Sequence, residues 1–576
     1  MKKKFYLVGM LAAGLTFAGC TDDIDDASGN GIVEGATGYV KVAVNLPTTS
    51  GNSTRGVNDN FDDGLADEYK VNSGIIAFFA GASESEATLV KAYTMSTGGW
   101  SISGDANDQI TTKSVVIQEA PIPAEGNTLY ALVILNPNSV VSVSLTGGLL
   151  INSSEMNAGG EATISNLQGF LQGQLVDSYT KKNNEASFLM TNAPLAVGLS
   201  SSFESTILTP VTVYTNKTQA EGAMTPDQIY VERAVAKVTL KGFTHNDDGS
   251  YTKDVKTDAG SVFSGDKVTL TGWTLNMTNK STALVRNVSD FNTTWKNIIT
   301  SGGSPYFYGS NKITTDPDRY RIYWAKDMNY ASTDTGSDAF NNYTSETDDA
   351  SIAWNTDTDD DTQNSHPLYC LENTMDVEVA KQTPAPITYV LLKTKYDFDT
   401  SSEDEDFFML QNDPSKGTMT QTDFLDEVNT LCGYTSEGDK LTIADLTSVN
   451  GGLIDTKDEI KTLFNLQGAD TKAEFVLSKV GPIKYYKEGV AYYYASYIKH
   501  FGDDYAVDPR DPNKNADETT GLGYYGVVRN NWYELNISSI SGPGEPEITP
   551  PTDNYGYINA QINILSWAKR QQDVNL

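Results

Sequence analysis

An alternation of apolar and polar residues opens the patterned part of the chain, in the stretch GYVKVAVNLP at positions 38–47. Apolar side chains at every second position are typical of a β-strand, because successive side chains point to opposite faces. One face of this strand carries Val40, Val42, Val44 and Leu46, and the residues between them are mostly polar. The pattern therefore predicts a strand with one buried, aliphatic face.

Further short apolar runs follow, separated by connections rich in turn residues. They lie at residues 74–81, 113–118, 128–137, 186–192, 208–215, 230–243, 266–279, 319–325, 366–374, 385–398, 489–501 and 525–540. Only residues 420–431 and 456–466 show the i, i+3, i+4 apolar spacing of a helix. Many short strands with long polar connections predict an all-β chain built from β-sandwiches, with a few short helices in its second half.

The C-terminal end combines a spacer with one more strand. Residues 541–553 contain four prolines, so this segment cannot pair as a central strand and is expected to be an extended, semi-rigid spacer. The strand pattern returns in residues 557–567, YINAQINILSW. Its aliphatic face carries Ile558, Ala560, Ile562 and Ile564.

The first and last strands therefore share one pattern, a Tyr followed by four aliphatic residues at period two. Many edge strands look alike, so their context matters more than the pattern. Arg55 stands alone in a polar loop just after the first strand, and the next arginine is Arg233. An isolated site for a protease after one strand, and a spacer before the other, suggest that the first strand is removed and an equivalent strand from another copy takes its place.

Composition and charge narrow the function classes. The chain has 576 residues with 41 basic and 75 acidic side chains, a net charge of −34. Nucleic-acid binding needs a basic surface, so this balance argues against a nucleic-acid partner. Strong acidity is more simply explained by a solvated, soluble exterior.

Residues 1–20 are expected to be a targeting segment. Three lysines precede an apolar run that is too short for a stable membrane span and that ends in FAGC. Small residues followed by Cys20 are typical of a bacterial lipobox, in which the cysteine becomes the lipidated N-terminus. We therefore expect a lipoprotein precursor that leaves the cytoplasm, with lipidation at Cys20.

The sequence offers no convincing catalytic or metal site, and we expect neither enzymatic activity nor a cofactor. His245, His366 and His500 stand far apart, without a nucleophile or metal-ligand spacing around them. Residues 355–361, NTDTDDD, imitate the start of a calcium loop but lack the glycine and the final glutamate that such a loop needs.

The two remaining cysteines, Cys370 and Cys432, lie in no motif spacing. They could form a disulfide in an oxidising compartment, although two separate buried thiols are the simpler interpretation.

The chain resembles the Bacteroidales fimbrillins, the type V pilins, and among them the major shaft subunit of the short fimbriae. The resemblance spans nearly the whole chain. It rests on the segments FAGC, STRG, ALVILNP, VERAVAKVTL, YCLENT, YYGVVRNNWYELNISSISGPG and ILSWAKRQQDVNL. The RNNWYELNI…GPG run and the terminal strand are its most specific parts.

This resemblance implies two transthyretin-like, Greek-key β-sandwich domains in tandem and a role as a structural pilin in adhesion and biofilm formation. The lipidated precursor would reach the outer membrane, be cut between Arg55 and Gly56 by an arginine-specific, trypsin-like protease, and enter an extracellular fimbrium. The partners would be copies of itself in a head-to-tail filament, anchor and tip subunits, and host or bacterial receptors. The family's tip subunits lack a C-terminal donor extension and its anchor subunit keeps the N-terminal segment, so both features favour a shaft subunit.

The expected organisation follows in chain order: signal peptide 1–20, propeptide with the removable strand 21–55, N-terminal sandwich 56–225, C-terminal sandwich 226–540, and spacer with donor strand 541–576. A different class of function stays open, a monomeric surface lipoprotein that binds glycan or peptide. The two hypotheses differ in polymerisation, because a monomeric binder needs no cut at Arg55.

Overall fold

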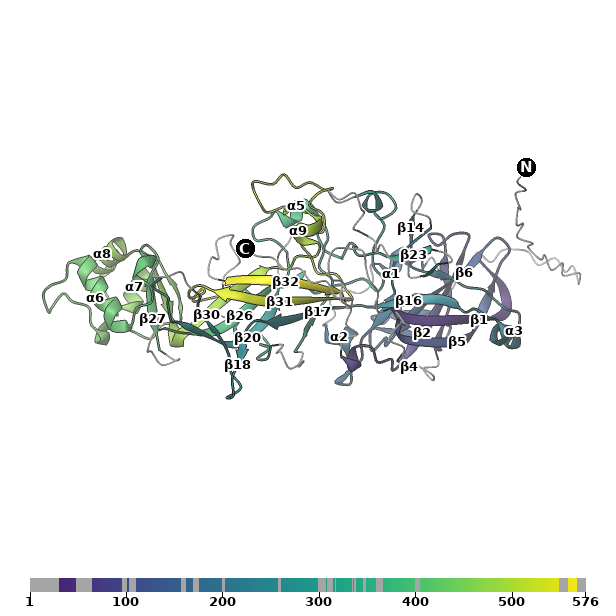
Figure 1. Cartoon of the computed structure of the whole chain (residues 1–576), viewed down its shortest axis with the longest axis horizontal. Coiled ribbons are helices and arrows are strands. Elements are labelled where there is room, and N and C mark those ends of the chain that lie inside the picture. Colours follow the sequence, from purple (N-terminus) through teal and green to yellow (C-terminus); the bar gives the residue numbers. More distant parts are fainter. Residues whose placement is uncertain are drawn as a thin grey trace, which may run out of the picture.

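The structure is a computed structural model. It describes residues 31–47, 65–95, 101–102, 110–156, 162–168, 176–198, 203–256, 261–298, 307, 314–315, 318–333, 335, 338–344, 349–358, 366–398, 405–548 and 558–566. The molecule is elongated, and its sheets follow one another along the long axis (Figure 1). A large sheet formed mainly by the first part of the chain occupies one end, a sandwich lies in the middle, and three helices occupy the other end.

The large sheet has nine strands, in the order β3-β2-β6-β12-β16-β1-β5-β4, with β15 pairing with β6. The strands are β1 (Ile32–Pro47), β2 (Gly74–Gly81), β3 (Thr88–Met95), β4 (Ser101–Ile102), β5 (Ile110–Pro123), β6 (Thr128–Leu135), β12 (Met190–Asn192), β15 (Thr209–Pro210) and β16 (Asp227–Arg233). The sheet curls so that β5 lies against β2, β3 and β6. The apolar side chains of the sheet fill the space inside this curl and form the first hydrophobic core. Later segments of the chain complete the core, within residues 284–325, 371–387 and 501–528.

The middle of the molecule is a β-sandwich. One sheet has the order β25-β17-β31-β32, formed by β25 (Leu368–Cys370), β17 (Ala236–Lys241), β31 (Asn531–Ile540) and β32 (Ile558–Ser566). The facing sheet has the order β18-β19-β20-β26-β30, formed by β18 (Thr244–His245), β19 (Tyr251–Asp254), β20 (Lys267–Asn276), β26 (Tyr389–Asp397) and β30 (Val490–Tyr497). Alternate residues of both sheets point inward and form a second core.

The far end packs three helices on a small sheet, β27 (Phe407–Leu410), β29 (Ile483–Tyr486) and β28 (Gly452–Ile454). Helix α6 (Gln421–Cys432) begins at a Thr420 cap, whose hydroxyl accepts a bond from the amide of Asp423, and ends at Gly433 in the left-handed region. Helix α7 (Lys457–Leu463) begins with a capping box. Helix α8 (Asp470–Val480) completes the third core.

Smaller elements lie between these parts. The strands are β7 (Val141–Val143), β8 (Leu149–Ile151), β9 (Ser154–Met156), β10 (Lys181–Lys182), β11 (Glu185–Ala186), β13 (Leu195–Val197), β14 (Glu204–Thr206), β21 (Thr278–Asn279), β22 (Thr314–Thr315), β23 (Asp318–Arg321) and β24 (Phe340–Asn341). The short helices are α1 (Ile164–Leu167), α2 (Asp177–Thr180), α3 (Lys217–Gly222), α5 (Val377–Ala380) and α9 (Gly502–Tyr505), and the 3-10 turns are η1 (Ala66–Glu68), η2 (Trp295–Asn297), η3 (Pro414–Lys416), η4 (Ile443–Asp445) and η5 (Lys487–Gly489).

The predicted fold class is confirmed: the chain is mostly β-strand with short helices, and the predicted helices at 420–431 and 456–466 are α6 and α7. Helix α8 was not predicted. The predicted run at 230–243 divides between two sheets, because β16 belongs to the first sheet and β17 to the sandwich. The division into two tandem domains at residue 225 stays a prediction.

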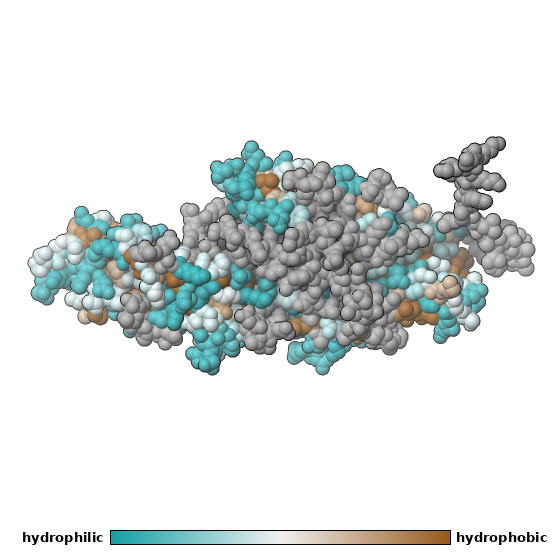
Figure 2. All heavy atoms as spheres, in the orientation of Figure 1, coloured by the Kyte–Doolittle hydropathy of each residue, from teal (hydrophilic) through white to brown (hydrophobic). Residues whose placement is uncertain are grey.

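Figure 2 shows the hydropathy of one face of the described surface. On the face shown in Figure 2, hydrophilic residues dominate the described surface over α6, α7 and α8. Large hydrophobic side chains that are exposed within the described residues are scattered along the chain; they are Val33, Leu65, Val115, Leu145, Met224, Val262, Leu431, Ile443 and Phe475. Scattered exposed apolar residues are normal for a soluble surface.

Candidate functional site

The predicted first strand, β1, lies inside the large sheet, with a hydrogen-bonded neighbour on each side (Figure 1). On one side it pairs antiparallel with β5 over almost its whole length, from Ile32 opposite Pro123 to Pro47 opposite Ile110. On the other side Val42–Asn45 pair in parallel with Asp227–Tyr230 of β16. Removing this strand would therefore leave unpaired backbone groups on two strands at once, which is costly in the interior of a protein.

The aliphatic face of β1 is completely covered. Val40, Val42 and Val44 are 0% exposed and Leu46 is 1% exposed, and all four belong to the first core. Burying four such side chains contributes about 6–12 kcal/mol in gross terms, at about 1.5–3 kcal/mol each. An occupant of this position is thus needed for the first core to be complete. Whether this strand is removed stays a prediction.

The opposite face of β1 is partly covered, since Tyr39 and Lys41 are half-buried and Ala43 and Asn45 are buried, and its side-chain bonds are polar. The Lys41 ammonium donates to the carbonyl oxygens of Glu221, at 3.2 Å, and Ala223, at 2.6 Å, at the end of α3. Asn45 is 0% exposed. Its side-chain amide donates to Oε1 of Gln228 at 3.0 Å and to the carbonyl oxygen of Ile229 at 3.4 Å, so β1 is bonded to β16 through a side chain as well as through the backbone.

A third neighbour approaches the start of the strand. The backbone of Tyr39 exchanges two hydrogen bonds with Tyr214, at 2.8 and 2.7 Å. Gly38 is buried beside this bridge. A Cβ atom on Gly38 would lie 2.6 Å from the carbonyl oxygen of Tyr214 and 2.7 Å from Cγ1 of Val213, closer than real Cβ atoms come to other heavy atoms. Glycine is therefore the one residue that fits at position 38 without a shift of the backbone.

Soon after β1, a set of buried polar contacts at Glu68 holds the chain in place. Glu68, in η1, is 1% exposed and forms an ion pair of 2.9 Å with Lys237 of β17. The hydroxyl of Tyr369 donates to Oε1 of Glu68 at 2.6 Å. Nε of Arg233 donates to the backbone carbonyl oxygen of Glu68 at 2.7 Å. Burial alone would raise the pKa of Glu68, but Lys237, Arg233 and Tyr369 together hold that pKa below its usual value of 4.5. The anchor is thus a charged carboxylate buried between the two main sheets.

Sequence reasoning missed this anchor. Glu68 lies in the polar stretch LADEYK, and its cation is far away along the chain, so no local pattern connects the two residues. The predicted lipidation site Cys20 and the predicted cleavage site, Arg55 and Gly56, lie outside the described residues. In the chain, the predicted cleavage site comes after Pro47, at the end of β1, and before Leu65, which precedes η1.

The predicted donor strand forms β32 and pairs with its own chain. It runs antiparallel to β31, with Ile564 opposite Tyr533, Ile562 opposite Leu535 and Ile558 opposite Ile540. β32 is the last strand of its sheet, so only one of its edges is paired by the order of that sheet. The structure thus places β32 in the sandwich and β1 in the large sheet, and it does not bring the two together (Figure 1).

The remaining candidate residues have structural surroundings. Cys370 and Cys432 are buried free thiols, and burial raises the pKa of the Cys370 thiol to about 12. His500 is 1% exposed and lies 2.8 Å from the hydroxyl of Tyr533. His245 stacks on Tyr251. In the part of the chain that the structure describes, no group of His, Cys, Asp and Glu is arranged to hold a metal ion.

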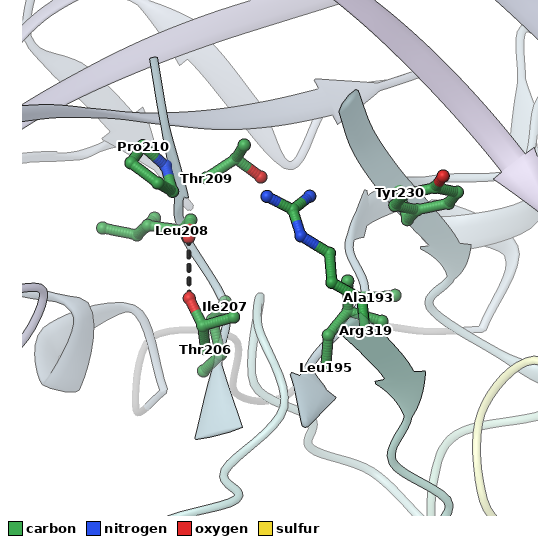
Figure 3. Close-up of a pocket in the computed structure, with 9 residues that line it drawn as sticks. All are labelled: Ala193, Leu195, Thr206, Ile207, Leu208, Thr209, Pro210, Tyr230 and Arg319. Atoms are coloured by element: carbon green, nitrogen blue, oxygen red, sulfur yellow. Dashed lines mark hydrogen bonds between the residues drawn. The ribbon is translucent and has the colours of Figure 1, made fainter. Parts of the chain in front are cut away.

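A cavity beside β16 is too small for a ligand. It is lined by Ala193, Leu195, Thr206, Ile207, Leu208, Thr209, Pro210, Tyr230 and Arg319, and its volume is about 10 Å³ (Figure 3). Such a space holds at most one water molecule. The guanidinium group of Arg319 points between Thr209 and Tyr230, and its Nη1 donates to the carbonyl oxygen of Gln228 at 2.9 Å. This arginine therefore supports β16, the strand that binds β1.

Two open hollows are larger. One, of about 360 Å³, lies at the start of β1 and is lined by Ile122, Pro123, Asn127, Thr128, Leu129, Val211, Val213, Tyr214 and Thr215. The other, of about 500 Å³, is lined by Asp349, Lys393, Asn450, Gly451, Lys487, Glu488, Val490, Tyr492 and Pro546. Of the helices that the structure describes, none is both long and apolar enough to cross a membrane.

Comparison with protein families gives one match. Residues 484–573 match the family model of the C-terminal part of the major fimbrial subunit protein type IV, fimbrillin. The match includes both β31 and β32. No curated protein matches the chain in sequence.

Three solved structures resemble the whole chain at low sequence identity. A candidate cell adhesion protein from Parabacteroides distasonis is 12% identical, with 93% of this chain and 99% of that chain covered and a TM-score of 0.38. The tip fimbrial protein Mfa3 from Porphyromonas gingivalis, truncated at its C-terminus, is 11% identical, with 92% and 100% covered and a TM-score of 0.32. A candidate cell adhesion protein from Bacteroides eggerthii is 8% identical, with 93% and 99% covered and a TM-score of 0.34.

Proposed function

We propose that the chain, whose residues 484–573 match the family model of the C-terminal part of fimbrillin, is a shaft subunit of a cell-surface fimbria. The precursor is exported as a lipoprotein, carries its lipid on Cys20 at the outer membrane, and is cut between Arg55 and Gly56. The C-terminal strand of one subunit then replaces β1 of the next, and the resulting filament supports adhesion and biofilm formation.

The observation that carries this proposal is the position of β1. It is a central strand whose four aliphatic side chains complete the first core, yet only one covalent connection, residues 48–64, joins it to the rest of the described chain. Arg55 lies in that connection. After a cut there, β1 is held by non-covalent contacts alone. The chain beyond the cut is still held by the ion pair between Glu68 and Lys237.

The cut changes the competition between β1 and a donor strand. In the precursor, β1 is tethered next to its position, so its effective concentration there far exceeds that of a strand from another copy. The precursor is therefore monomeric. Cleavage removes the tether, β1 becomes a peptide that can leave, and the two edges of β5 and β16 become available for strand addition.

The incoming strand brings an equivalent set of contacts. Ile558, Ala560, Ile562 and Ile564 supply about 5–10 kcal/mol of gross apolar burial, at about 1.5–3 kcal/mol for each large aliphatic side chain and less for alanine. Ordering the spacer and the strand reduces this gain. Because donor and acceptor surfaces differ, each subunit presents both and the assembly grows head to tail into an open filament.

The remaining partners follow from this assembly. An arginine-specific, trypsin-like protease makes the cut, anchor and tip subunits end the filament, and surface receptors of the host or of other bacteria bind it. Residues 1–55 contain as many basic as acidic side chains, so the mature subunit keeps the strong negative charge of the precursor. Like charges on neighbouring filaments keep them apart in solution.

Limited digestion of the purified precursor with an arginine-specific protease tests the proposal. Intact mass should show a cut after Arg55, followed by multimers that resist SDS. Both should be absent in Arg55→Ala, whereas a chain that ends before Tyr557 should be cut but stay monomeric. A clean cut that leaves stable full-length monomers would overturn strand exchange and favour the monomeric surface binder.

A further inference from the structure

From the surroundings of β1 we infer the register in which the C-terminal strand of a second copy binds. This inference rests on the proposed function, strand exchange, and adds to it a defined pairing: Gly556 takes the position of Gly38, and Asn563 takes the position of Asn45. The occupant is thus residues 556–564 of another copy, running in the same direction as β1.

The first constraint is steric. The Gly38 position lies against the carbonyl oxygen of Tyr214 and Cγ1 of Val213, which leaves no room for a Cβ atom. The close approach is fixed by the two hydrogen bonds between the backbones of Tyr39 and Tyr214. Any strand that uses this bridge must therefore carry glycine just before it.

The C-terminal segment offers one residue that satisfies this constraint. Gly556 is the only glycine in residues 549–576, and it stands directly before Tyr557, as Gly38 stands before Tyr39. A shift of two residues either way would bring Asn554 or Ile558 to the glycine position, where its Cβ would collide with Tyr214. A shift of one residue would turn the aliphatic face away from the core.

The second constraint is polar and lies seven residues further on. Asn45 is completely buried and bonds to Gln228 and Ile229 of β16. In the register that Gly556 selects, the residue at this position is Asn563. The donor strand therefore brings the same amide to the same partners, and Gln228 is not left without its bond.

The aliphatic face fits the same register. Ile558, Ile562 and Ile564 fall on the positions of Val40, Val44 and Leu46, all within the first core. Ala560 falls on Val42 and is the smaller residue. The largest change on the other face is Gln561 at the position of Ala43. Ala43 is 0% exposed and stands opposite Val115, which is 49% exposed, so the longer side chain of Gln561 would have to pass beside Val115 to reach solvent.

Disulfide cross-linking between introduced cysteines tests this register directly. The inferred pairing places Gln561 of one copy opposite Val115 of the next, so a chain with Val115→Cys and Gln561→Cys should form covalent ladders under mild oxidation once it has been cleaved and assembled. The matched control pairs Val115→Cys with Asn559→Cys, two residues away on the same face, and should give at least tenfold less cross-linked product. The native Cys370 and Cys432 are buried. Variants with only one introduced cysteine, Val115→Cys or Gln561→Cys, measure any cross-linking through these native cysteines.

Substitution of the glycine tests the steric constraint. Gly556→Ala should leave cleavage at Arg55 unchanged and slow multimer formation at least tenfold, whereas Asp553→Ala, in the spacer, should assemble like the wild type. Adding Val213→Ala, which removes one of the two colliding atoms, should restore part of the assembly rate of Gly556→Ala.

The outcomes separate the two claims. A wild-type chain that is cut but never assembles overturns the proposed function. If the wild type assembles but the chain with Val115→Cys and Asn559→Cys gives more cross-linked product than the chain with Val115→Cys and Gln561→Cys, the register is overturned and strand exchange stands. Assembly of Gly556→Ala at the wild-type rate also overturns the register.

Discussion

Strands β1 and β17 occupy the same place in their two sheets. Each is the first strand of its sheet along the chain, and each pairs in parallel with a strand from the end of its region, β1 with β16 and β17 with β31. On the other side each pairs antiparallel, β1 with β5 and β17 with β25. The paired part of each strand is buried, with Val42 and Val238 each 0% exposed, although β1 also has an exposed first part at Val33–Gly35.

The two strands differ in how the chain holds them. β17 follows β16 after only Ala234 and Val235, and its Lys237 forms the buried ion pair with Glu68. β1 is followed by residues 48–64, which contain Arg55. The two strands are thus alike in the direction of their pairing, whereas β1 is the longer strand and has a different connection. If β1 is exchanged as proposed, we expect the connection to be what distinguishes it from β17.

The largest effect should come from removing β1 altogether. A chain that begins at Gly56 lacks a central strand and should assemble or aggregate without any protease, with complete loss of the monomer in size-exclusion chromatography with light scattering. Adding a synthetic peptide of residues 38–47 should restore the monomer, because the peptide completes the first core. A peptide of residues 236–241 from β17 is the control and should have no effect. A soluble, stable monomer without any peptide would contradict the central role of β1.

The next largest effect concerns the anchor at Glu68. Glu68→Gln leaves the Lys237 ammonium buried without its carboxylate, which should lower the free energy of unfolding by about 3–5 kcal/mol in urea denaturation. Glu534→Gln is the matched control, because the Lys241–Glu534 pair, 2.6 Å apart, is partly exposed at the lysine. This control should cost less than about 1 kcal/mol.

The pH dependence of this effect has a defined sign. The pKa of Glu68 is lowered in the folded chain from its usual value of 4.5, so its contribution is complete above pH 4.5 and is lost as the pH falls through the lower, folded-state value. The stability difference between the wild type and Glu68→Gln should therefore shrink on acidification below pH 4.5. A difference that stays constant down to the acid transition would show that the Glu68 charge does not stabilise the fold.

How far the sequence predicts this molecule depends on the range of the interactions. The alternation in residues 38–47 and 557–567 is local, and it predicts the end of β1 at Pro47 and both ends of β32 to within one residue, although β1 begins earlier than predicted, at Ile32. The caps and apolar spacing of α6 and α7 are local as well. Helix α8 was missed although Ala473, Val476 and Val480 have helical spacing, because its polar residues weaken the pattern.

The non-local features could not be predicted from one sequence. Nothing in residues 38–47 indicates that β1 lies between β5 and β16, because strand pairing is decided by distant parts of the chain. The pair of Glu68 and Lys237 is a further example, since both residues look like ordinary surface charges until the fold brings them together. In the sequence Gly38 is only the first residue of the alternating stretch 38–47, and its steric role is visible only with the backbone of Tyr214 beside it.

A matched pair of core substitutions separates stability from strand release. Val42→Ala and Val238→Ala each remove two methyl groups from a fully buried side chain and should each lower the free energy of unfolding of the precursor by about 2 kcal/mol. After cleavage at Arg55, only Val42→Ala should speed the dissociation of β1, by about 30-fold, which is 2 kcal/mol expressed as a rate ratio. Release of a fluorescent label attached near the N-terminus of β1 measures this rate. Equal acceleration by both variants would mean that release requires unfolding of the whole chain.

The smallest effect should come from the two lysines on these strands. Lys41→Met keeps the aliphatic stem but removes the bonds from the ammonium to the carbonyl oxygens of Glu221 and Ala223, so β1 release after cleavage should accelerate about fivefold, for a loss of about 1 kcal/mol. Lys241→Met on β17 removes the partly exposed pair with Glu534, and it should leave the release of β1 unchanged while stability falls by less than about 1 kcal/mol. If Lys241→Met accelerated release as much as Lys41→Met, release would follow overall stability, and the contacts of β1 itself would not set its lifetime in the cleaved subunit.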